Sequence, residues 1–83
     1  MPRIDPNLPE LRLWLSTLPA ADRCAMLHAL AMVDQRLKHS RTWDALKADA
    51  CRGMSIADRE AMLLRAMRIA ENFRQEMAAA AAA

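Results

Sequence analysis

The helical fold of the chain is indicated by residues 20–38, which read AADRCAMLHALAMVDQRLK. Apolar side chains recur in this stretch at intervals of three and four residues, which is the period of one face of an α-helix. The best row is formed by Met26, Leu30, Val33 and Leu37. A second row beside it is formed by Ala20, Cys24, Leu27 and Ala31. The spacing predicts one long helix from residue 19 to about residue 39, with a broad apolar surface.

A short helix is predicted before the long one. Asn7 stands three residues before Glu10, and Pro9 lies between them, which is the chemistry of a helix start. Residues 1–7 contain two prolines and are expected to form an extended arm. The helical domain therefore begins at residue 8.

Two further helices are predicted after the long one. Ser40 or Thr42 provides a cap for a short helix over residues 43–51. Gly53 follows at the place where a left-handed residue commonly ends a helix. Ser55 stands three residues before an aspartate and predicts the start of the last helix, which is about two dozen residues long.

The composition supports an all-α fold for the whole chain. The 83 residues include one Gly, one Val, three Ile and no Tyr, so strand formers and hairpin turns are scarce. We expect a small bundle of about four helices, two long and two short, with no β-sheet. It occupies a single domain over residues 8–78 and is followed by an alanine-rich tail over residues 79–83.

Charge and composition exclude several classes of function. The net charge is +2, and acidic and basic residues alternate along the chain instead of forming a dense basic stripe. Charges interrupt every apolar run before it could span a membrane, and the N-terminus has no apolar signal segment. We therefore expect a cytoplasmic protein whose two cysteines are free thiols. With one glycine and no catalytic motif, we expect neither an enzyme nor a bound cofactor.

A metal site has a weak signal on the long helix. Cys24 and His28 are four residues apart and share one helical face, which is a spacing that metal sites use. A complete site would need Cys51, His39 or carboxylates in addition, and no known ligand motif frames the pair. We therefore expect no metal. A Cys24–Cys51 disulfide would require an oxidising compartment, against which the rest of the sequence argues.

The width of the apolar surfaces indicates a partner. On the last helix the apolar positions cover an arc of about 160° of the helix surface. A helix that packs on one neighbour needs an apolar arc of only about 100°. Six methionines beyond the first residue add adaptable side chains. We expect a non-catalytic interaction module (an accessory subunit, an adaptor or chaperone, or a homodimer) that contacts another protein or a second copy. The expected interface is formed by Trp14, Met62, Leu63, Ala66, Met67 and Phe73.

Trp43 is expected in the core, whereas Trp14 fits either the core or an interface.

A helix-turn-helix DNA-binding protein is the alternative. Residues 42–70 supply a short helix, a turn with a glycine and a capped second helix. The nucleic-acid contacts would then be Arg59, Arg65 and Arg68. The last helix is longer than a usual recognition helix, and it begins with acidic residues where phosphates would approach.

One arginine lies inside an apolar surface. Arg23 is at the edge of the apolar arc of the long helix, so it needs a partner for its charge or must reach outward to water. Asp34 shares that arc farther along and is a candidate partner across a helix–helix or subunit contact. We expect a structural pairing for Arg23, and an anion or phosphate site is the alternative.

Overall fold

The computed structural model describes residues 9–82, with side chains from residue 13 onward. The residues described form five helices and no strand, which confirms the all-α prediction. The helices are α1 (Pro9–Ser16), α2 (Ala20–Val33), α3 (Gln35–Lys38), α4 (Arg41–Ala50) and α5 (Ile56–Ala82). The predicted arm over residues 1–7 and the predicted helix start at Asn7 lie outside the described residues.

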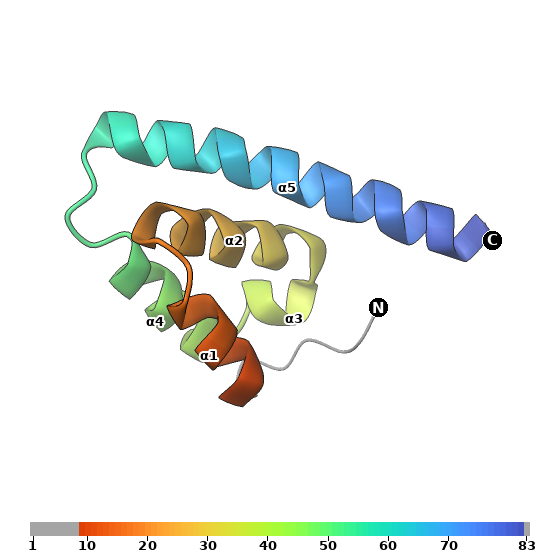
Figure 1. The fold of residues 1–83 in the computed structure, drawn as a ribbon, viewed down its shortest axis with the longest axis horizontal. Helices are drawn as coiled ribbons and strands as arrows, with labels where there is room; N and C mark the ends of the chain where they lie inside the picture. Colours follow the sequence, from red (N-terminus) through yellow and green to blue (C-terminus); the bar gives the residue numbers. More distant parts are fainter. Residues whose placement is uncertain (1–8, 83) are drawn as a thin grey trace.

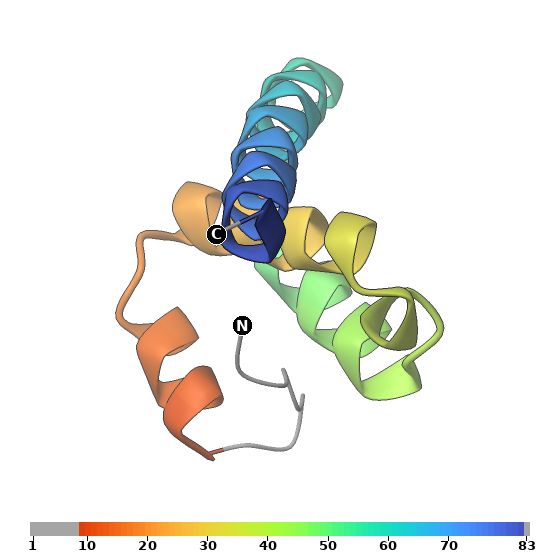
Figure 2. The same cartoon turned by 90° about the vertical axis from the view of Figure 1, so that its right-hand side faces the viewer.

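Helix α2 lies at the centre of the molecule. Helix α5 lies along one side of it and runs in the same direction, while α1 and α4 lie on the other side (Figures 1 and 2). Neighbours on both sides explain why α2 is apolar around most of its circumference. Its buried residues are Cys24, Ala25, Leu27, Ala29, Leu30 and Ala31.

The long helix predicted to reach residue 39 is interrupted at Asp34, which corrects the sequence prediction. Asp34 has an extended backbone, with φ −128° and ψ 108°, so α2 ends at Val33 and α3 begins at Gln35. Its carboxylate accepts a hydrogen bond from the backbone N–H of Arg36 at 3.0 Å, which caps the new helix. Leu37 still reaches the core after the break and is completely buried.

The predicted caps at Ser40 and Ser55 and the predicted left-handed residue Gly53 are confirmed, while α4 begins at Arg41 instead of residue 43. The Ser40 hydroxyl accepts a hydrogen bond from the backbone N–H of Trp43 at 3.2 Å, and Ser55 does the same for Asp58 at 3.1 Å. Gly53 has φ +82°, a left-handed conformation that favours glycine. These boundaries could be predicted because each one depends on chemistry within a few residues.

Trp43 holds α4 against α2, as expected for a core residue. Its side chain is completely buried, and its indole N–H donates a hydrogen bond to the carbonyl of Leu27 at 2.8 Å. The indole thus fills the space between the helices and also satisfies its only polar atom.

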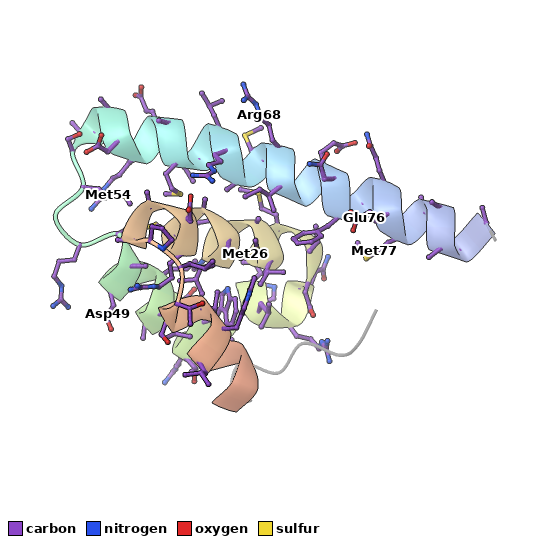
Figure 3. All side chains as sticks on the ribbon, viewed as in Figure 1. Met26, Asp49, Met54, Arg68, Glu76 and Met77 are labelled. Carbon is purple, nitrogen blue, oxygen red and sulfur yellow. A yellow bond between two sulfur atoms is a disulfide. The ribbon has the colours of Figure 1, made fainter. Side chains whose placement is uncertain are left out.

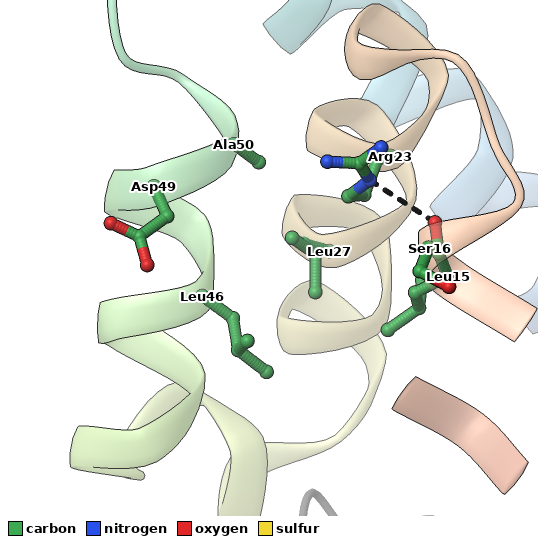
Figure 4. Close-up of a pocket in the computed structure, with 7 residues that line it drawn as sticks. All are labelled: Leu15, Ser16, Arg23, Leu27, Leu46, Asp49 and Ala50. Carbon is green, nitrogen blue, oxygen red and sulfur yellow. Dashed lines mark hydrogen bonds between the residues drawn. The ribbon is translucent and has the colours of Figure 1, made fainter. Parts of the chain in front are cut away.

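Arg23 fixes α1 to α2 through backbone carbonyls, so the predicted pairing with Asp34 is wrong. The guanidinium donates to the carbonyl of Leu15 at 3.1 Å and to that of Leu18 at 3.0 Å. These carbonyls belong to the C-terminal end of α1 and the loop after it, where backbone acceptors lack helical partners. Asp34 pairs instead with the Arg36 side chain at 2.9 Å. Figure 4 shows Arg23 beside Leu15 in a hollow that α1, α2 and α4 surround.

Helix α5 is much longer than the helix that supports it. Its 27 residues correspond to about 40 Å, whereas the 14 residues of α2 correspond to about 21 Å. The C-terminal turns of α5 therefore extend beyond the rest of the molecule (Figure 1). The alanines predicted as a separate tail continue this helix to Ala82. In the described part of the chain, no helix is both long enough and apolar enough to cross a membrane.

Candidate functional site

A row of large apolar side chains remains exposed on α5. Leu64 and Met67 are 60% and 57% exposed, and Leu63 beside them is 39% exposed. Met32 at the end of α2 is also exposed and borders the same groove as Leu64 and Met67. We call these four residues the apolar face. Such side chains usually lie inside a protein of this size, so a contiguous group of them at the surface indicates a contact site.

The structure separates the predicted interface residues into two groups. Met62 and Ala66 are buried in the core that α2 and α5 share, and Phe73 is half-buried against it. They hold α5 in place and do not present a free surface, which corrects this part of the sequence prediction. Leu63 and Met67 are exposed, as an interface requires. Leu64, which flanks the predicted arc, is exposed beside them although it was not among the predicted interface residues.

A shallow groove of about 620 Å³ runs along the apolar face. Its charged lining residues alternate in sign along α5, in the order Arg68, Glu71 and Arg74. Arg68 lies on the side of α5 away from the rest of the molecule (Figure 3). Arg74 reaches back to α2 and donates to the carbonyl of Met32 at 3.4 Å. The groove therefore combines an apolar floor with charges of both signs, the composition of a protein-contact surface.

Trp14 lies apart from the apolar face. Its side chain is 45% exposed, and Leu13 next to it is also exposed. Both belong to α1, which is on the opposite side of α2 from α5 (Figure 2). The structure thus leaves Trp14 available for a contact but does not unite it with Leu63 and Met67.

The three arginines of the DNA-binding alternative do not share one face. Successive positions on a helix are about 100° apart, so Arg59 and Arg65 project about 120° from one another. Arg65 forms an ion pair with Asp22 of α2, and Arg59 borders a separate hollow beside Cys51. Arg68 projects outward from α5 (Figure 3). A recognition helix needs its basic side chains to converge on one groove of the DNA.

The two cysteines form a disulfide, so the prediction of free thiols is wrong. Cys24 of α2 and Cys51 at the end of α4 are joined with their Cα atoms 5.9 Å apart. His28 lies one turn after Cys24, and its Nε2 atom is 3.6 Å from the sulfur of Cys51. The sulfur and nitrogen atoms of these three residues all lie within 4.8 Å of one another. The spacing in the sequence predicts that Cys24 and His28 share one face of α2. Cys51 joins them only through the packing of α4 on α2.

The environment of His28 disfavours its charged form. Partial burial lowers the pKa of His28, and repulsion from the Lys47 ammonium lowers it further. The unfolded chain, with an ordinary histidine pKa of about 6.5, therefore takes up this proton at a higher pH than the folded chain does.

The free energy of unfolding should consequently fall as the pH is lowered through about 6.5, and His28 should contribute no change above that value. Urea titrations between pH 7 and about 5, before most carboxylates protonate, measure the effect. His28→Gln should flatten this part of the profile, while His39→Gln should preserve it. A wild-type profile that rises with falling pH would contradict the assignment.

No protein-family model matches this chain, and no curated protein or solved structure matches it.

Proposed function

We propose that this protein is a non-catalytic helical interaction module that uses the apolar face of α5 and α2. The observation that carries the proposal is the exposed group formed by Leu63, Leu64, Met67 and Met32 on a helix supported from one side only. Burying apolar surface against a partner contributes about 25 cal/mol for each Å² removed from water. An arrangement of helix against helix suits such a face, because side chains three and four residues apart form its contact row.

A second copy of the chain is the partner that the face fits best. Glu71 lies between Arg68 and Arg74 at the edge of the groove, so charges of both signs are present on one short segment. If two α5 helices pack antiparallel around a twofold axis near residues 64–67, the exposed Leu64 and Met67 of one copy face the same residues of the other copy. The charged residues of both signs then lie at the edge of the contact. We therefore propose a homodimer. In the cytoplasm, where we propose that it acts, the Cys24–Cys51 disulfide would be reduced.

The test is the mass of the protein in solution, measured by sedimentation for the wild type and for Met67→Asp and Leu64→Asp. The wild type should dimerise, and each variant should be a monomer, because a carboxylate buried without a partner in the interface loses its hydration. Both variants should keep wild-type helicity, since both positions are exposed within one chain.

Asn72→Asp is the matched control. It adds the same charge on α5 at an exposed position about 140° around the helix from Met67, and it should leave the dimer intact. A wild type that stays monomeric up to about 1 mM would refute the dimer, since the association would then be worth less than about 4 kcal/mol. A dimer that neither variant disrupts would place the interface elsewhere.

The arginine geometry favours this function over DNA binding. Arg59 projects about 120° from Arg65 and about 180° from Arg68, and Arg65 is already paired with Asp22. A DNA-binding protein would show an affinity for duplex DNA that falls steeply with salt and depends on these three arginines. The interaction module predicts neither property.

A further inference from the structure

We propose that reduction of the Cys24–Cys51 disulfide creates a metal site, in which the two cysteines and His28 bind a thiophilic cation of the Zn²⁺ type. The inference does not rest on the proposed dimer, and its site borders the apolar face only at Leu63. Two soft sulfur donors with an imidazole are a ligand set that proteins use for zinc. Three such groups converge here from α2 and α4, with all ligand atoms within 4.8 Å of one another.

The distances already match part of a zinc coordination shell. Zinc binds sulfur at about 2.3 Å and nitrogen at about 2.0–2.1 Å, so a tetrahedral shell places sulfur and nitrogen about 3.6 Å apart. The sulfur of Cys51 and Nε2 of His28 are 3.6 Å apart. The two sulfurs would need to move to about 3.8 Å from one another. Breaking the covalent bond between them allows this through small rotations of the two side chains.

Reduction and metal binding are separate steps. A dithiol or phosphine reductant supplies two electrons and is itself oxidised to a disulfide or a phosphine oxide, the S–S bond breaks, and two protons complete the two thiols. Zn²⁺ then binds both sulfurs as thiolates and the imidazole as a neutral ligand, and two protons return to the solution. The resulting centre carries no net charge, so the neighbouring Lys47 and Arg59 do not oppose it.

Helices α2 and α4 bring the three ligands together. Cys24 and His28 are on successive turns of α2, and Cys51 caps the C-terminus of α4. Cys24 is completely buried, so one side of the site is closed by the core. A bound cation would therefore replace the disulfide as the link between α2 and α4. Reducing compartments, where disulfides seldom persist, are where this exchange would matter.

The fourth coordination position faces a hollow of about 360 Å³. His28 and Cys51 form part of its wall, and Lys47, Arg59 and Leu63 complete much of the remainder. A water molecule or a small anion is the ligand that suits this position. Structural zinc sites usually have four protein ligands, whereas three protein ligands with one open position are typical of sites that exchange a ligand.

The experiment uses the full chain, reduced with a phosphine and titrated with Co²⁺ as a coloured substitute for Zn²⁺. One equivalent should produce a thiolate-to-cobalt charge-transfer absorption, which Zn²⁺ then abolishes by displacement. The oxidised protein should give no such band. Zn²⁺ should also raise the melting temperature of the reduced protein, because it binds only the folded arrangement of ligands.

Variants identify the ligands. Cys51→Ser and His28→Gln should each weaken Co²⁺ binding by at least about 100-fold, since losing a ligand costs no less than losing one of its supporting contacts. His39→Gln replaces the exposed histidine and should bind like the wild type. Circular dichroism of each reduced variant establishes that its helices are retained. Absence of a thiolate band in the reduced wild type, or equal affinity in His28→Gln, would overturn the proposal.

Discussion

Replacing Trp43 with alanine should remove most of the stability of this domain. A buried Trp→Ala change costs about 3–5 kcal/mol, because it deletes apolar contacts and leaves a cavity. Trp43 is completely buried between α2 and α4, and its loss also leaves the carbonyl of Leu27 without its indole partner. A domain of this size has a total unfolding free energy of about 4–12 kcal/mol. Urea denaturation followed by circular dichroism should therefore show a much lower midpoint or no folded baseline.

Trp14→Ala is the matched control for this experiment. Trp14 is 45% exposed, so its removal creates little cavity and should cost well under half as much. Fluorescence distinguishes the two residues as well, since the emission of the buried Trp43 should shift to the red on unfolding more than that of Trp14. Equal losses of stability in both variants would mean that Trp43 is not the residue that holds α4 to α2.

Reducing the disulfide should have the second largest effect. The bond closes a loop with a sequence separation of 27 residues. Removing it frees the unfolded chain, and loop-closure entropy for this length corresponds to about 3.5 kcal/mol at 25 °C. For a domain of fewer than 100 residues, each kcal/mol lowers the melting temperature by about 4–8 °C. We therefore expect the melting temperature to fall by about 14–28 °C in reductant without added metal.

The variant Cys24→Ala/Cys51→Ala provides the control for reduction. Its melting temperature should be close to that of the reduced wild type and should not respond to reductant. A wild type whose melting temperature is the same with and without reductant would show that the disulfide does not stabilise the fold. Recovery of stability on adding Zn²⁺ to the reduced wild type, but not to this variant, would connect the disulfide to the proposed metal site.

The fold class and most helix ends could be predicted because they depend on local chemistry. Ser40 and Ser55 cap helices wherever the chain folds, and Gly53 accepts a left-handed backbone at little cost. The break at Asp34 was missed because the apolar spacing continues through it. Val33 and Leu37 are four residues apart in the sequence, which is the spacing expected within one helix. The chain nevertheless turns there, because the Asp34 carboxylate accepts a competing hydrogen bond from the Arg36 backbone N–H.

The candidate sites depended on tertiary packing to a greater degree. Helical periodicity correctly places Met62, Leu63 and Met67 on one broad apolar arc, but it cannot tell which edge of that arc will be covered. The answer follows from how α5 docks on α2, which buries Met62 and leaves Leu63 and Met67 at the surface. Leu64 lies at the margin of the arc. It belongs to the apolar face only because none of the described helices covers it.

The sequence alone thus determined the all-α class, the caps at Ser40 and Ser55 and the presence of wide apolar helix surfaces, because hydrogen bonds and periodicity over a few residues control these features. Only the tertiary structure decided which apolar side chains remain exposed and that Cys51 meets Cys24 and His28. Both outcomes come from contacts between residues far apart in the chain. Such contacts depend on how whole helices pack, and no local pattern of residues specifies them.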